Sequence, residues 1–141
     1  MKYVSFIILL FAASALFAQD STKTNTVIPP KIVTKLNFGE DLQVNDIRLK
    51  FVEVVQDSRC PKAVQCIWEG EVIILVDVYE HNKKVVQKKL VFNARSTFNN
   101  EIGNLFTSDV LNISGIKVMP YPVASNKILK EDYYVQLDVS N

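Results

Sequence analysis

The chain has 141 residues, a length typical of one domain, with 48% hydrophobic and 22% charged residues. Sixteen lysines and arginines stand against fifteen aspartates and glutamates, so the formal net charge is only +1. A nearly neutral chain has no broad positive field to attract it to nucleic acid or to anionic lipid. We therefore expect no nucleic-acid partner.

Residues 1–18 have the pattern of a cleaved secretory signal peptide. Lys2 is followed by an uncharged apolar run, small residues lie near Ala18, and polar sequence begins at Gln19. The apolar run is shorter than the about 20 residues of a membrane span. The residue after the cut is not the cysteine that a bacterial lipoprotein would acylate. We predict a periplasmic or secreted protein with no membrane span in the mature chain.

Residues 19–30, QDSTKTNTVIPP, are polar and end in two prolines. Such a segment buries too little apolar surface to order itself, and the prolines favour an extended backbone. We predict a disordered lead over 19–30. The folded domain would then cover 31–141, a length that allows one hydrophobic core.

Alternating apolar residues predict neighbouring strands in the middle of this domain. The run DIRLKFVEVVQ places one set of apolar side chains on one side of a strand, namely Ile47, Leu49, Phe51 and Val55. The run EVIILVDVYE is apolar on both faces, which is typical of a central strand covered on both sides. The sequence HNKK and the run VVQKKLVFN follow, so we predict a hairpin over 71–93 with an exposed turn.

Two further strands are predicted near the C-terminus. The run ISGIKVMPYP reads as a strand that ends at its prolines, and YYVQLDVS alternates cleanly. Its buried face would carry Tyr133, Val135, Leu137 and Val139. Residues 94–111 fit an irregular loop, a short helix near 101–106, or a strand with a bulge. Six or seven short strands predict an all-β domain, either a single antiparallel β-sandwich or a small barrel.

The segment DSRCPKAVQCIWEG, residues 57–70, contains both cysteines and the only tryptophan of the chain. Two cysteines this close in an exported protein most simply form a disulfide between Cys60 and Cys66. Closing so short a loop stabilises the fold by roughly 2 to 2.5 kcal/mol. The bond would hold the segment in one shape between two strands.

Two other chemistries remain open for this segment. A thiol-redox site needs an exposed thiolate of low pKa, and Arg59 and Lys62 would favour one, although the spacing is C-x5-C rather than C-x-x-C. A calcium-stabilised module would use the acidic residues Asp57, Glu69 and Glu71, although no calcium-loop pattern is present. Zinc lacks ligands, because His81 is the only histidine. We expect no bound cofactor and no metal site.

The remaining members of the candidate binding or structural loop are Asp57, Ser58, Arg59, Pro61, Trp68, Glu69 and Gly70. Asp57 and Ser58 are typical turn openers that bond nearby backbone amides. Arg59 would pair with Asp57 or Glu69, or receive a partner's carboxylate. Gly70 indicates a bulge or a close backbone approach.

Trp68 has both a structural and a functional interpretation. A lone tryptophan beside a disulfide commonly packs over that bond or closes one end of the core. Tryptophan and arginine are also enriched at binding hot spots, so the loop would present Trp68 and Arg59 to a partner. That partner would be a protein, a glycan or a small ligand.

Enzyme chemistry has little support in the sequence. A Ser-His or Cys-His arrangement would have to include His81, and no nucleophile elbow surrounds any candidate. The four glycines form no phosphate-binding loop. Paired carboxylates would have to come from Glu53, Asp57, Glu69 or Glu71, and no pattern selects two of them. We expect a protein that is not an enzyme.

The motif D-S-R-C-P…C-x-W-x-G resembles a set of small exported bacterial proteins of unestablished function. In that set the motif also lies between two apolar strands. A looser match extends the resemblance to about residues 45–139, and Glu69 stands where a small residue would be expected, which favours an exposed loop edge. The resemblance implies an exported β-domain with paired cysteines and supplies no catalytic residues.

Overall fold

The structure is a computed structural model that describes residues 33–93, 103–124 and 126–140. The chain separates into the units Met1–Pro30 and Lys31–Asn141. The predicted signal peptide 1–18 and lead 19–30 lie outside the described residues, as do residues 94–102.

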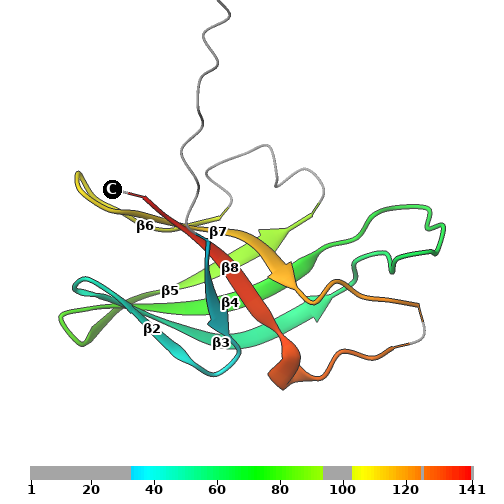
Figure 1. Ribbon diagram of the computed structural model, residues 1–141, viewed down its shortest axis with the longest axis horizontal. Coiled ribbons are helices and arrows are strands. Elements are labelled where there is room, and N and C mark those ends of the chain that lie inside the picture. Colours follow the sequence, from blue (N-terminus) through cyan, green and yellow to red (C-terminus); the bar gives the residue numbers. More distant parts are fainter. Residues whose placement is uncertain (1–32, 94–102, 125, 141) are drawn as a thin grey trace, which may run out of the picture. The chain divides into compact units, whose positions relative to one another are not determined.

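The described residues form two antiparallel sheets of four strands that pack against each other (Figure 1). The strand orders are β1-β8-β7-β6 and β2-β3-β4-β5. The elements are β1 Val33–Asn37, β2 Asp41–Val44, β3 Ile47–Asp57, β4 Val72–Glu80, β5 Lys83–Phe92, β6 Asn104–Thr107, β7 Asn112–Met119, the 3₁₀ turn η3 Lys130–Asp132, and β8 Tyr134–Ser140. The predicted all-β sandwich is confirmed. Its strands number eight rather than six or seven, because β1 and β2 are too short and exposed to give a clear apolar pattern.

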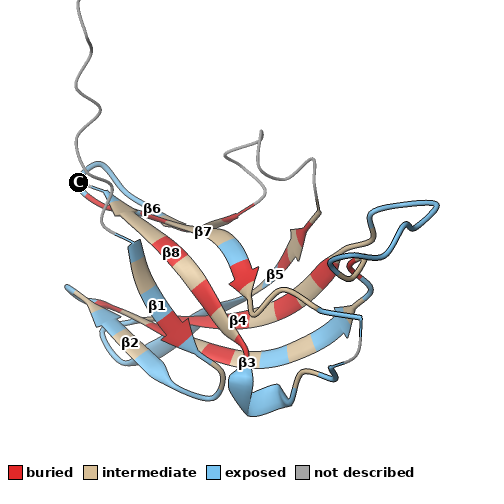
Figure 2. Cartoon of the chain, turned by 45° about the vertical axis from the view of Figure 1, so that its right-hand side comes forward, coloured by how far each residue is buried: buried red, intermediate tan, exposed pale blue. Residues whose placement is uncertain are grey.

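The core lies between the two sheets (Figure 2). The inward side of β4 is fully buried, and Val135 and Leu137 face it from β8 with no exposed surface. Burying such side chains contributes about 1.5–3 kcal/mol each. The predicted alternation is confirmed over 133–137, because Tyr133, Val135 and Leu137 are buried while their neighbours on the other face are less so. Val139, which was expected on the same buried face, is only partly buried.

The sequence assigned Val55, near the end of β3, to the wrong face of the sheet. Val55 was expected with Leu49 and Phe51, which are fully buried, but it is 50% exposed. The pairing of β3 with β4 shifts register between Phe51 and Glu53 and again between Val54 and Gln56. Each bulge adds one residue and turns the following side chains to the other face.

The expectation that β4 is covered on both sides is also wrong for the described residues. On its outer face Ile73, Leu75 and Tyr79 are only half-buried. Asp77 on this face forms an ion pair with Lys84 at 2.6 Å and accepts a hydrogen bond from Gln87 at 2.8 Å. These polar partners allow an acidic residue to be buried in the middle of an apolar strand.

The predicted hairpin is confirmed, and within the described part of 94–111 the structure bears out one of the three readings, a strand with a bulge. β4 and β5 join through His81 and Asn82, both exposed and with φ of 48° and 62°. β6 is a strand with a register shift between Asn104 and Phe106. The alternative of a helix near 101–106 is therefore wrong for residues 104–106.

Candidate functional site

The segment 57–70, hereafter the stapled loop, connects β3 to β4 and extends from one end of the sheets (Figure 1). Cys60 and Cys66 form the predicted disulfide, with their Cα atoms 6.0 Å apart. Cys60 is half-buried and Cys66 is exposed. The bond closes the middle of the loop on itself.

Arg59 ties the base of the loop to the opposite sheet. Its side chain is only 7% exposed. Nε and Nη2 donate to the two carboxylate oxygens of Asp57 at 2.8 and 2.6 Å. On the other side of the guanidinium, Nη1 donates to the carbonyl of Val118 at 2.6 Å and Nη2 to that of Pro120 at 3.0 Å. Arg59 therefore links β3 to the end of β7, and its predicted alternative partner Glu69 is not used.

Asp57 receives a third side-chain hydrogen bond from Tyr133, whose hydroxyl donates at 2.9 Å. Burial raises the pKa of Asp57, but the Arg59 guanidinium and the Tyr133 hydroxyl lower it by more, so the pKa lies below its ordinary value. Burial and the adjacent Asp57 carboxylate raise the pKa of Tyr133 to about 12. At neutral pH the three groups form a charge-balanced network with Tyr133 protonated.

The backbone at the base of the loop is paired across its two arms. Ser58 N donates to Glu71 O at 2.8 Å, and Cys60 N donates to Glu69 O at 2.8 Å. Ser58 Oγ also accepts from Glu71 N at 3.2 Å. Gly70 has φ of +68°, and a Cβ atom there would lie 1.9 Å from Ser58 O. The predicted close backbone approach at Gly70 is confirmed. The predicted local turn-opening bond is made by Asp57, whose Oδ1 accepts from Arg59 N at 3.2 Å, whereas Ser58 bonds across the two arms.

The disulfide-closed part of the loop contains its own turn. Val64 N donates to Pro61 O at 3.3 Å, and Ala63 has φ of 64°. Lys62 N donates to Pro122 O at 3.0 Å, which ties this turn to the segment that follows β7. The backbone on one side of the loop is thus fixed by three devices: the turn, the disulfide and the contact with Pro122.

The tip of the stapled loop, defined here as Ile67 and Trp68, points into solvent. The exposed fractions are 106% for Ile67 and 84% for Trp68. The interpretation that Trp68 packs over the disulfide or closes the core is therefore wrong. Arg59, Tyr121 and Tyr133 occupy that end of the sandwich instead. The Arg59 guanidinium donates a hydrogen bond to the opposite sheet, and it lies 5.0 Å from the centre of the Tyr121 ring.

The acidic residues of the loop do not converge on a metal or a catalytic pair. Both oxygens of Asp57 bond Arg59, while Glu53 and Glu69 are exposed. Within residues 33–93, 103–124 and 126–140, no group of three or more His, Cys, Asp and Glu side chains is placed to hold a metal ion. His81 lies at the far end of β4, away from the loop.

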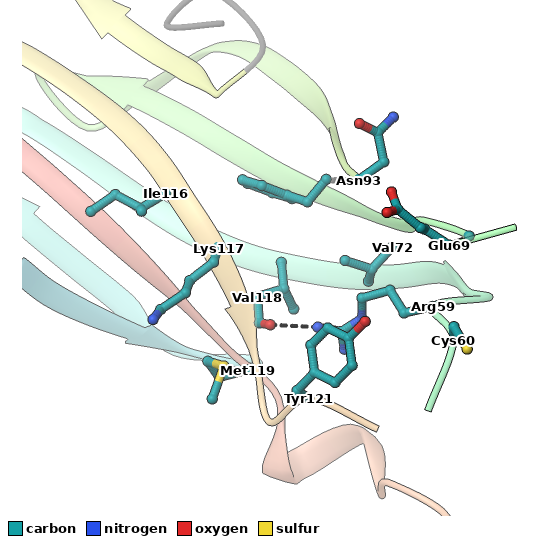
Figure 3. Close-up of a pocket in the computed structure, with 12 residues that line it drawn as sticks. Arg59, Cys60, Glu69, Val72, Asn93, Ile116, Lys117, Val118, Met119 and Tyr121 are labelled. Atoms are coloured by element: carbon teal, nitrogen blue, oxygen red, sulfur yellow. Dashed lines mark hydrogen bonds between the residues drawn. The ribbon is translucent and has the colours of Figure 1, made fainter. Parts of the chain in front are cut away.

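A pocket of about 350 Å³ lies beside the base of the stapled loop, between the two sheets (Figure 3). Its lining includes Val72 and Phe92 from one sheet and Val118 from the other, with Arg59, Glu69 and Tyr121 around them. Figure 3 shows the Tyr121 ring in front of the Arg59 side chain, with Glu69 and Asn93 on the opposite side. The pocket combines an apolar interior with a few polar groups.

Sequence reasoning did not find Tyr121 or the role of Tyr133. The alternation of β8 correctly placed Tyr133 on the buried face, but nothing local indicated that its hydroxyl would meet Asp57, 76 residues earlier. The acceptors for Arg59 are backbone carbonyls, which leave no signature in side-chain chemistry.

No protein-family model matches this chain. Comparisons with curated proteins and with solved structures find no significant match either. In the part of the chain that the structure describes, no helix has the length and apolar character needed to cross a membrane.

Proposed function

We propose that this protein is an exported, non-enzymatic binding module that recognises its partner through the tip of the stapled loop. The observation that carries the proposal is the near-complete exposure of Ile67 and Trp68 on a loop whose base is fixed. Large apolar side chains exposed together are typical of an interaction surface.

The rigid base favours binding through this tip. Association loses free energy whenever a loop has to be ordered, and a loop held in one conformation avoids much of that loss. The disulfide, the Arg59 bonds and the paired arms already hold residues 57–71. Trp68 then offers a large contact area with few rotatable bonds, as hot-spot tryptophans do.

The hydrogen bonds of Arg59 lead us to revise the role proposed for it from the sequence. The sequence suggested that Arg59 and Trp68 together contact a partner. Four bonds inside the protein occupy the Arg59 guanidinium, so we now assign Arg59 to the support of the loop and Trp68 to recognition.

Export is supported by the disulfide, because such bonds persist in oxidising compartments. It agrees with the sequence prediction of a signal peptide over 1–18 and with the resemblance to small exported bacterial proteins that share D-S-R-C-P…C-x-W-x-G. We place the protein in the periplasm or outside the cell. The partner belongs to one of three classes: protein, glycan or small ligand.

The thiol-redox alternative keeps one observation in its favour, the exposure of Cys66. An accessible disulfide sulfur is a condition for thiol exchange. The calcium alternative loses its support, because Asp57 is committed to Arg59 and Tyr133.

Affinity capture from an envelope extract of the source cells tests the binding proposal. The wild-type domain is compared with Trp68→Ala and with Val110→Ala, a control at another exposed apolar residue (74% exposed). We expect one component to be enriched near stoichiometrically by the wild type and Val110→Ala and lost with Trp68→Ala. Equal enrichment by Trp68→Ala, or enrichment of nothing, would overturn the assignment of the tip.

A further inference from the structure

The pocket beside the stapled loop has the composition of a small-molecule site rather than of a packing defect. Val72, Phe92 and Val118 have at most 7% exposure, so the pocket reaches the boundary of the core. A volume of about 350 Å³ falls in the range of about 300–1,000 Å³ found for ligand pockets. A cavity of about 150 Å³ holds benzene, so this one accommodates a group the size of a naphthyl ring.

Arg59 lines the pocket and keeps one guanidinium donor beyond its four hydrogen bonds. A guanidinium carries five N–H groups in a fixed plane. Four of them bond to Asp57, Val118 and Pro120. The fifth, on Nη1, has no partner among the described residues, and the side chain that carries it is 93% buried at the pocket wall. A ligand oxygen in the pocket would satisfy it.

The charges around the pocket cancel. Asp57 neutralises Arg59 at 2.6 Å. The other ionised lining residues are Glu69 and Lys117, one of each sign. An apolar cavity with a balanced lining gives no net compensation to a buried anion or cation, and burying an unpaired charge is costly. The lining therefore favours an uncharged ligand.

We propose that this pocket binds an uncharged, mainly apolar small molecule of about naphthyl size whose carbonyl, ether or hydroxyl oxygen accepts a hydrogen bond from Arg59. The site is separate from the tip, because Trp68 and Ile67 are not part of the lining. It adds a small-molecule activity to the domain and does not depend on the partner proposed for the tip.

Titration with prodan, an uncharged naphthyl ketone whose emission shifts to the blue in apolar surroundings, tests the proposal on the intact mature chain. We expect saturable binding to one site with a blue shift. An analogue with a methylene in place of the ketone should bind about tenfold more weakly, because the bond to Arg59 is lost. The anionic dye anilinonaphthalene sulfonate should bind more weakly than prodan.

Two variants locate the site. Ile116→Phe adds bulk to the half-buried lining and should weaken prodan binding at least tenfold. Val110→Phe, a matched change at an exposed residue outside the lining, and Trp68→Ala should each leave the affinity within twofold. Loss of binding with Trp68→Ala would move the site to the tip and contradict a separate pocket.

A measurement on the unmutated protein covers the case in which Ile116→Phe fails to fold. In a ¹⁵N-labelled sample, prodan should shift the Arg59 Nε–H signal and the backbone amide signals of residues 116–119 and of Tyr121. Absence of saturable binding, shifts confined to residues elsewhere, or tighter binding of the anionic dye would each overturn the proposal.

Discussion

The base and the tip of the stapled loop lie within fourteen residues of one another and have opposite environments. At the base, Asp57 and Arg59 are charged residues that the fold buries, with side chains 10% and 7% exposed. At the tip, Ile67 and Trp68 are apolar residues that the fold leaves in solvent. Hydrophobicity alone would have assigned the two pairs the other way round.

The burial of the charged pair and the exposure of the apolar pair follow from the hydrogen bonds and the loop geometry available at each place. The charges of Asp57 and Arg59 compensate each other, and Tyr133 and two backbone carbonyls satisfy their remaining groups, so their burial leaves few donors unmet. Ile67 and Trp68 are placed outside because the arms of the loop pair at Cys60 and Glu69 and the disulfide closes the turn between them. The base therefore serves folding, and the exposed tip is the surface for which we propose recognition.

The largest effect is expected from Arg59→Ala. The change leaves the Asp57 carboxylate buried without its cation and removes the donors to Val118 and Pro120. Breaking a buried ion pair from one side costs about 3–5 kcal/mol, so the free energy of unfolding in urea should fall by about that amount. Arg59→Lys, which keeps the charge and loses the planar fork, should be intermediate. A loss below about 1 kcal/mol with Arg59→Ala would contradict a structural base.

The next effect concerns the disulfide. Cys60→Ala/Cys66→Ala should lower the free energy of unfolding by about 2 kcal/mol, because the open loop gains entropy in the unfolded chain. The reduction potential, measured by equilibration with a dithiol buffer, should lie below about −300 mV as for structural disulfides. A potential close to those of thiol oxidoreductases would favour the redox alternative.

Tyr133→Phe should lower the free energy of unfolding by a smaller amount, about 1–2 kcal/mol, because it removes one hydrogen bond to a carboxylate. The pH dependence of stability distinguishes this variant from the wild type. The folded-state pKa of Tyr133 is raised from 10.0 to about 12, so its stabilisation is present below pH 10 and is lost as the pH rises towards 12. We expect the wild type to lose stability over that window and the variant to lose less. Equal alkaline slopes would remove Tyr133 from the network.

Asp57 has the opposite pH dependence. Its folded-state pKa lies below 3.8, so its contribution is present above pH 3.8 and is lost as the pH falls through the folded value. The free energy of unfolding should therefore decline below about pH 4, and Asp57→Asn should flatten that decline. Acid titrations of the two proteins followed by circular dichroism make the comparison.

The smallest effect on stability is expected from Trp68→Ala. A side chain that is 84% exposed contributes little to folding, and such surface changes commonly stay within about 0.5 kcal/mol. Chemical unfolding measures this, with Val110→Ala as the matched exposed control. Destabilisation by more than about 1 kcal/mol would show that the tip belongs to the folded core.

The strand pattern allowed much of the fold to be predicted, and the disulfide followed from the spacing of Cys60 and Cys66. The prediction was wrong where an irregularity of the backbone decides which face a side chain takes: the bulge between Phe51 and Glu53 turns Val55 outwards. In the site, Asp57 and Gly70 behaved as their residue types indicated. Trp68 did not, because its environment depends on the path of the loop. The partners of Arg59 are distant carbonyls, and no sequence pattern marks them.

The fluorescence of Trp68 tests the division between base and tip most directly, since it is the only tryptophan of the chain. The native emission maximum and its quenching by acrylamide are compared with those of the protein unfolded in urea. An exposed tip predicts nearly the same emission in both states and quenching close to that of the unfolded chain. A blue-shifted native emission that resists the quencher would mean that Trp68 packs against the protein, and the tip would no longer be available for recognition.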